Sequence, residues 1–124
     1  MKTLEVNSLV LAYLGDAVYE NYVRLYLVSL GYNHVKILWE KSLEFVSAKS
    51  QAKILKELIN ENFFTNQELE IIKRGRNTKS HSHPKNTDII TYKEATAFEA
   101  LLGYLKLENK EERIEEIMNK VFTH

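Results

Sequence analysis

The sequence contains no cysteine, which excludes disulfide bonds, thiolate metal sites and cysteine nucleophiles. A chain without cysteine suits a reducing compartment, so we expect a cytoplasmic protein. No apolar run approaches the roughly 20 residues of a membrane span, and polar and acidic residues follow the start too early for a signal peptide. We therefore expect no membrane among its partners.

Proline and glycine are also scarce, with one proline and four glycines among 124 residues. Because both residues interrupt regular structure, their scarcity predicts few turns and long elements. Apolar residues recur at helical spacing, and no stretch alternates convincingly with a period of two. We predict an all-α fold, and the length fits a single domain over residues 1–124.

Two long helices are predicted in the first half of the chain, over residues 4–29 and 34–60. Gly31 stops the first, since glycine readily adopts the left-handed conformation that ends a helix. The second is expected to be continuous. The expected buried positions are Leu9, Tyr13, Ala17 and Val18 on the first helix and Val35, Leu38, Trp39, Phe45, Val46 and Ala52 on the second.

Shorter helices are predicted in the second half. Residues 65–68 (TNQE) match a capping box, in which the first and last side chains each bond the other residue's backbone N–H at a helix start. Residues 75–87 mix glycine, serine, histidine, asparagine and proline and are expected to be irregular. Thr87 or Asp88 then caps a further apolar helix, and an amphipathic helix covers residues 110–122.

Positive charge is concentrated in one window, although 17 Lys+Arg balance 17 Asp+Glu overall. No acid lies between Glu70 and Asp88. The basic loop inside this window, residues 73–85, can either follow a phosphate backbone or be an ordinary solvated loop. It has no aromatic residue to stack on single-stranded bases, so a duplex bound through its shape and backbone is the better fit. The candidate RNA-binding residues are Lys73, Arg74, Arg76, Asn77, Lys79 and Lys85.

Two other interpretations of this window are weaker. His81 and His83 could ligate a metal or act as a general base, but no third ligand lies near them in the sequence. A helical DNA-binding regulator would carry base-reading side chains on a recognition helix, whereas these basic residues fall in a predicted loop. We assign no function to the two histidines.

Two acidic residues lie in apolar helical surroundings. Asp16 follows Gly15, and Glu99 lies between Ala95 and Gly103 with small residues on its own face. A buried carboxylate needs a partner, and small neighbours leave space for a hydrated cation such as Mg²⁺. Taken singly, each acid is more simply interpreted as an exposed residue or as the partner of a Lys or Arg. Together with the basic loop, they favour metal-dependent phosphodiester chemistry.

Five motifs, in order, resemble the ribonuclease III family, and most closely its compact bacterial branch, Mini-III. They lie at residues 12–20 (AYLGDAVYE), 46–49 (VSAK), 73–77 (KRGRN), 84–88 (PKNTD) and 95–105 (ATAFEALLGYL). Because they span nearly the whole chain, the resemblance is more specific than any single motif.

The resemblance implies a homodimeric, Mg²⁺-dependent endonuclease that hydrolyses double-stranded RNA, with precursor 23S ribosomal RNA as the expected substrate. It implies that Asp16 is the principal catalytic acid and metal ligand and Glu99 the second ligand. Mini-III lacks a separate double-stranded-RNA-binding domain, so the catalytic domain must itself hold the RNA. The alternative is a non-catalytic duplex-RNA-binding module of the same fold. Its support is that uncharged residues stand where ordinary ribonuclease III has acids, at Leu9, Ala12 and Thr96.

Glu20 and Lys49 are accessory candidates. Glu20 lies one turn beyond Asp16 and could join the site through a water or pair with a cation. Lys49 is in line with Phe45 and Ala52 on the apolar stripe of the predicted second helix. It could approach the scissile phosphate or hold a carboxylate. The alternative is a lysine that packs its stem and keeps its ammonium group in water.

Overall fold

The computed structural model describes residues 2–79 and 88–124, and every regular element in these two ranges is helical. The predicted all-α fold is therefore confirmed. None of the helices in the described residues has the length and apolarity needed to cross a membrane. In chain order the elements are a 3-10 helix η1 (Thr3–Glu5), then α1 (Ser8–Ser29), α2 (Val35–Val46), α3 (Ala48–Asn60), α4 (Asn66–Arg76), α5 (Ile89–Leu107) and α6 (Glu111–Thr123).

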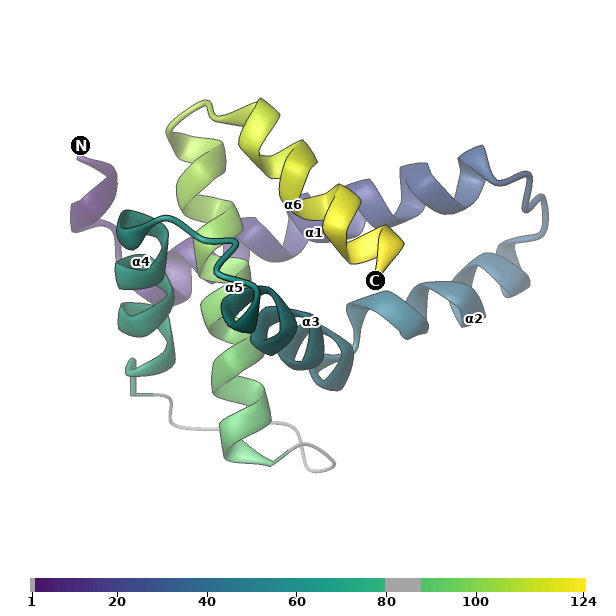
Figure 1. The fold of residues 1–124 in the computed structure, drawn as a ribbon. Coiled ribbons are helices and arrows are strands. Elements are labelled where there is room, and N and C mark those ends of the chain that lie inside the picture. The colour runs from purple at the N-terminus through teal and green to yellow at the C-terminus, as the bar shows by residue number, and fades with distance from the viewer. Residues whose placement is uncertain (1, 80–87) are drawn as a thin grey trace.

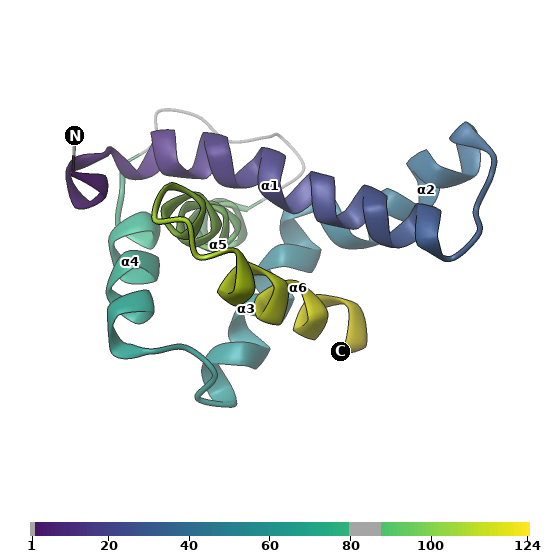
Figure 2. The same ribbon diagram turned by 90° about the horizontal axis from the view of Figure 1, so that it is seen from above.

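Helix α5 is the centre of the fold. Figure 2 shows it nearly end-on, with α1, α3, α4 and α6 packed around it. All of its residues from Glu94 to Leu105 are buried except Glu99, which is half-buried. A helix covered on every side is apolar all round, and this explains why α5 lacks a polar face in the sequence. Glu99 therefore places a half-buried carboxylate in an otherwise buried segment of the central helix.

The crossing of α1 and α5 depends on two glycines. A Cβ added to Gly15 would overlap the backbone carbonyl oxygen of Glu99, and one added to Gly103 would overlap that of Leu11. The backbones of the two helices are thus in direct contact, with no space for a methyl group between them. Since Asp16 follows Gly15, this contact brings Asp16 next to Glu99.

The predicted continuous helix over residues 34–60 is wrong: it is two helices, α2 and α3, separated at Ser47. Ser47 has an extended backbone (φ −63°, ψ 150°), and its hydroxyl accepts the Ser50 N–H at 3.1 Å as the cap of α3. The apolar spacing continues across the break and so conceals it. The C-terminal part of α1 extends away from α5 together with α2, whereas α3 packs against α5 (Figure 1). As a result Val35 and Trp39 are exposed and Ala52 is buried.

The buried face of α1 is also not the predicted one. Val18 is buried as expected, but Leu9, Tyr13 and Ala17 are exposed, Tyr13 to 84%. Apolar residues surround most of this helix, so their spacing could not select the face that meets α5. The residues of α1 that are buried are Ser8, Leu11, Ala12, Gly15, Val18, Tyr19, Val23 and Leu27.

Helix α4 extends further than predicted, because residues 75 and 76 are helical rather than irregular. Gly75 lies inside the helix and allows close packing: a Cβ there would lie 2.9 Å from the Cα of Ala97. The basic residues at 73, 74 and 76 occupy the last turn, where positive charge stabilises the carboxyl end of a helix. At the start of α5, Asp88 caps the helix by accepting the Thr91 N–H at 2.8 Å, which confirms one of the two predicted caps.

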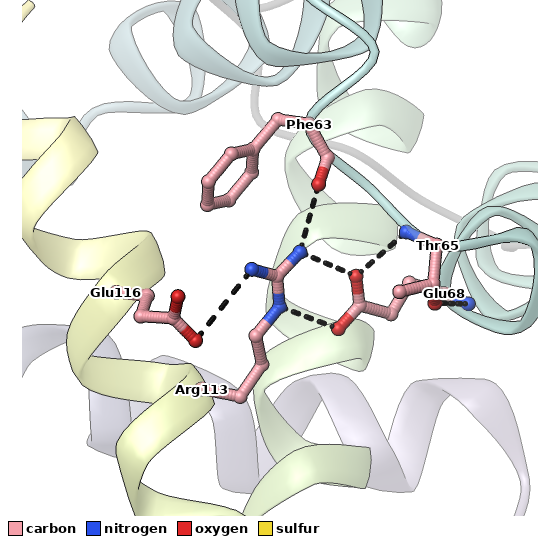
Figure 3. A network of polar contacts seen from close by, with 5 residues as sticks. All are labelled: Phe63, Thr65, Glu68, Arg113 and Glu116. Carbon is pink, nitrogen blue, oxygen red and sulfur yellow. Dashed lines mark hydrogen bonds and ion pairs between the residues drawn. The ribbon is translucent and has the colours of Figure 1, made fainter.

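An ion-pair network joins α6 to the start of α4 (Figure 3). Arg113 donates through Nε and Nη2 to the two carboxylate oxygens of Glu68, both at 2.8 Å, and Nη2 also donates to the Phe63 carbonyl at 2.8 Å. Glu68 also accepts the Thr65 N–H at 3.0 Å, while the Thr65 hydroxyl accepts the Glu68 N–H at 3.1 Å. The predicted capping box is confirmed, and its carboxylate also holds α6 in place.

Candidate active site

Asp16 of α1 and Glu99 of α5 lie together at the glycine crossing. Asp16 is exposed and Glu99 is half-buried. Burial, a hydrogen bond to the Asp16 carboxylate and the negative charge of Asp16 raise the pKa of Glu99 to about 8. The two acids singled out in the sequence are thus brought into one site from positions more than 80 residues apart in the chain.

Gln51 of α3 contacts this pair and was not identified in the sequence. Its side chain is 2% exposed, and Nε2 donates to Glu99 Oε2 at 3.3 Å and to the Val46 carbonyl at 3.1 Å. Its Oε1 is buried and has no hydrogen-bond partner among residues 2–79 and 88–124. The available signal was a polar residue beside Ala52 on a stripe expected to be apolar, two positions after the VSAK motif.

Tyr19 and Glu20 of α1 lie beside the acidic pair. The buried Tyr19 hydroxyl donates to the Phe45 carbonyl at 2.7 Å, and burial together with the charge of Glu99 raises the pKa of this phenol. The Glu20 carboxylate lies 3.5 Å from the Arg24 guanidinium, and its charge also contributes to the raised pKa of Glu99. Glu20 therefore pairs with a cation and still adds negative potential to the site.

The acidic pair suits a hard divalent cation. Adjacent carboxylates repel each other when both are charged, and their oxygens are ligands that Mg²⁺ accepts. Within residues 2–79 and 88–124, no group of three or more His, Cys, Asp or Glu is arranged to hold a metal. Mg²⁺ commonly keeps several waters and binds through one or two carboxylates plus substrate phosphate, so a pair is a fitting set of ligands. Thr96 adds no acid here, and its hydroxyl donates to the Tyr92 carbonyl at 2.9 Å.

Lys49 does not occupy the position that its sequence pattern predicted. The break at Ser47 places it on α3, whereas Phe45 is on α2, so the shared stripe does not exist. Lys49 is exposed in the first turn of α3.

The basic residues divide into two groups. Lys73, Arg76, Asn77 and Lys79 are exposed at the end of α4 and just after it, so part of the predicted basic loop is helical. Lys85, with His81 and His83, lies outside the described residues.

Arg74 is the exception among these residues because its guanidinium fastens the N-terminal segment. It donates through Nε to the Ser8 hydroxyl at 3.1 Å, through Nη1 to the Leu4 carbonyl at 2.7 Å and through Nη2 to the Val6 carbonyl at 3.0 Å. Three of its five N–H groups are thereby committed within the molecule. This role was not anticipated from the run of basic residues.

Comparison with known proteins decides the family. Residues 9–110 match the sequence model of the family described as Ribonuclease III domain. The chain belongs to the ribonuclease III family. It is similar to Mini-ribonuclease 3 of Staphylococcus aureus, with 48% identity over 95% of this chain and 88% of the relative. Mini-ribonuclease 3 of Brevibacillus brevis is 50% identical over 94% of this chain and 85% of the relative.

A crystal structure of a Fusobacterium nucleatum protein supports the same assignment. It aligns with a TM-score of 0.90 and 36% identity, and the alignment covers 100% of both chains. The predicted Mini-III resemblance and the ribonuclease III fold are confirmed, and this Mini-III family member is an endoribonuclease.

Proposed function

We propose that this Mini-III ribonuclease hydrolyses double-stranded RNA with Mg²⁺ held by Asp16 and Glu99. The observation that carries the proposal is that the Gly15 crossing brings Asp16 next to Glu99, where burial, followed by the hydrogen bond and charge of Asp16, raises the pKa of Glu99 to about 8. Two acids placed together in this way destabilise a fold unless a cation or another partner compensates them. The ribonuclease III family assignment supplies the reaction class.

Each residue has a defined part in this mechanism. A bound Mg²⁺ would supply Lewis-acid activation of water and neutralise charge that develops on the phosphoryl group. Glu99 would release its proton to solvent on holding the ion, because a carboxylate ligand must be deprotonated. Asp16 is exposed and leaves the site open to a phosphate of the duplex. Glu20 adds negative potential from one turn along α1.

RNA binding is proposed for the exposed basic end of α4. Lys73, Arg76, Asn77 and Lys79 supply cationic or polar groups to the phosphate backbone, with Lys85 as a further contact. These contacts come from the catalytic domain itself, residues 1–124. The expected natural substrate, precursor 23S ribosomal RNA in the cytoplasm, rests on the resemblance to Mini-III.

A homodimer is proposed because large apolar side chains remain exposed on α1 and α2. Exposed apolar patches on this scale mark interaction surfaces. A second copy would place two acidic pairs on opposite strands of one duplex and give staggered cuts. The exposed side chains are Val10, Tyr13, Leu25, Val28, Val35, Trp39 and Leu43.

Cleavage of a long RNA duplex, with and without Mg²⁺, tests the proposed function. The wild-type protein should cut only with Mg²⁺, whereas Asp16→Asn should bind the duplex, keep its fold and fail to cut. A non-catalytic binding module predicts binding without cleavage by both proteins. An Asp16→Asn protein that cuts at the wild-type rate would overturn the assignment of the site.

Lys49 is kept as a candidate for contact with the scissile phosphate, and a separate measurement tests it. Single-turnover cleavage by Lys49→Met, in a protein with wild-type circular dichroism, should be slower if Lys49 reaches the phosphate. A normal rate removes Lys49 from the mechanism.

A further inference from the structure

We propose that Gln51 is a positioning residue of the acidic site, which orients the Glu99 carboxylate for a divalent cation. The inference rests on the proposed function, since it concerns the same metal site. It starts from three properties of one buried side chain: a donor bond to Glu99, a donor bond to Val46, and an oxygen that finds no hydrogen-bond partner in the part of the chain that the structure describes. Gln51 itself lies outside the five family motifs of the sequence.

The partners of Gln51 fix the direction of its amide. The Val46 carbonyl can only accept, and so can the Glu99 carboxylate when it is charged. The two Nε2 hydrogens match these two acceptors, at 3.1 and 3.3 Å. The opposite orientation would put Oε1 against both acceptors and leave Nε2 with none. Gln51 therefore acts as a double donor that joins α2 to α5.

The break between α2 and α3 creates this arrangement. Val46 is the last residue of α2, and the carbonyls of a final turn have no partner within their own helix. Two neighbouring carbonyls at this end are satisfied by side chains: Tyr19 donates to Phe45 at 2.7 Å and Gln51 donates to Val46. With one N–H held by backbone, Gln51 presents the other to Glu99 in a fixed direction.

Packing alone does not account for the amide. The Oε1 of Gln51 is buried without a partner among the described residues, and an unpaired buried oxygen is unfavourable for folding. Methionine would fill similar space without this unpaired oxygen, although it would also leave the Val46 carbonyl without its donor. The amide does supply a donor to one oxygen of Glu99. Hydrogen bonds that orient a metal ligand in this way typically change metal affinity or activity by about 10–100-fold.

The test compares metal binding by Gln51→Met and by Tyr19→Phe, in full-length protein without RNA. Free Mn²⁺ measured by electron paramagnetic resonance reports affinity without any turnover. Gln51→Met should bind Mn²⁺ about tenfold more weakly than wild type. The Mg²⁺ concentration for half-maximal cleavage should rise by the same factor, with most of the rate recovered at saturating Mg²⁺. Tyr19→Phe removes the neighbouring bond to the same helix junction but no donor to Glu99, so its Mn²⁺ affinity should stay within about twofold of wild type.

The outcomes separate this inference from the proposed function. If wild type binds Mn²⁺ and cleaves, but folded Gln51→Met matches its affinity, the role of Gln51 is overturned and the function stands. Equal losses of Mn²⁺ affinity in both variants also overturn it. They would show that disturbing the junction of α2 and α3, and not removing the donor to Glu99, weakens metal binding. If wild type neither binds metal nor cleaves, both proposals fail.

A second measurement needs no substitution and applies even if Gln51→Met does not fold. The side-chain NH₂ resonances of Gln51 in wild-type protein should shift as Mg²⁺ is added, with the same midpoint as metal binding. Resonances that do not move at saturating Mg²⁺ overturn the proposal.

Discussion

Gly15 of α1 lies directly against the backbone carbonyl of Glu99 in α5. The residue after Gly15 is Asp16, so one contact between two backbones sets both the packing of the central helix and the separation of the two proposed catalytic carboxyl groups. Helix packing and site geometry therefore depend on the same atoms. A change at this contact should affect stability and activity together.

Gly15→Ala tests this coupling. The added methyl group would overlap the Glu99 carbonyl oxygen, so α1 and α5 must separate. We expect a loss of about 3 kcal/mol in the free energy of unfolding, at the upper end of the usual range for overpacking. Cleavage should fall even where the protein remains folded, because Asp16 moves relative to Glu99. Urea unfolding and single-turnover cleavage measure the two effects.

Gly75→Ala is the matched control for Gly15→Ala. It crowds α5 at a different crossing, where a Cβ would lie 2.9 Å from the Cα of Ala97. It should lower stability but leave single-turnover cleavage by the folded protein, at saturating RNA, near that of wild type. If Gly15→Ala keeps wild-type stability and cleavage, the crossing of α1 and α5 tolerates a methyl group and the predicted coupling is wrong.

The helical class, the Thr65 capping box and the close pairing of Asp16 with Glu99 were predictable from the sequence. The first two follow from local spacing and local hydrogen bonds. The pairing depended on the family resemblance, since apolar surroundings alone favour an exposed acid or an acid paired to Lys or Arg. It is the glycines at 15 and 103 that make the pairing physically possible.

Three features of the structure were not evident from the apolar spacing of the sequence. The break at Ser47 leaves the apolar spacing unchanged, so periodicity predicted one helix where there are two. The contact between Gln51 and Glu99 exists only because α3 packs against α5. In the sequence Arg74 cannot be distinguished from its basic neighbours. In the structure η1 and the start of α1 lie beside α4, and Arg74 donates hydrogen bonds to them. For Gln51 and Arg74 the deciding partner lies far along the chain: the Glu99 carboxylate for Gln51, and residues 4–8 for Arg74.

Salt dependence of RNA binding tests the basic end of α4. Replacing Lys73, Arg76 and Lys79 by alanine, in an Asp16→Asn background that does not cut, should weaken duplex binding. The slope of log affinity against log salt should become shallower by about one unit for each phosphate that the variant no longer neutralises. Fluorescence anisotropy with a labelled RNA duplex at several salt concentrations provides the measurement.

Arg74→Met provides the contrast within the same turn. Its guanidinium is committed to the N-terminal segment, so the variant should lose about 1–3 kcal/mol of stability and keep a nearly wild-type salt slope. If the triple variant keeps the wild-type slope, the RNA surface lies elsewhere.

The Glu68–Arg113 pair predicts a pH-dependent stability. Burial opposes the charge on Glu68, but hydrogen bonds from Arg113 and the Thr65 backbone outweigh it and lower the pKa of Glu68. A carboxyl group with a lowered folded-state pKa stabilises the fold above its unfolded pKa of about 4.3, and this contribution is lost as pH falls through the folded pKa. Glu68→Gln should cost about 3 kcal/mol at pH 7. The difference from wild type should shrink below about pH 4 in urea unfolding.

Glu116→Gln is the control for this pair. Glu116 is exposed and lies 3.7 Å from Arg113, so its loss should change stability by less than about 1 kcal/mol. A Glu68→Gln penalty that stays constant down to about pH 3 would contradict the assigned role of the charge.

Trp39 on α2 tests the proposed dimer surface. Its side chain is 58% exposed and lies beside the exposed Val28 and Val35. The Arg24 guanidinium lies 5.1 Å from the centre of its ring. Buried tryptophans at interfaces often contribute about 2 kcal/mol or more, so Trp39→Glu should raise the dimer Kd by roughly 30-fold or more. Sedimentation equilibrium should show a monomer at concentrations where wild type is a dimer. Leu107→Gln changes another exposed apolar residue, at the end of α5, and should leave the mass unchanged. A Trp39→Glu protein that remains as dimeric as wild type would place the interface elsewhere.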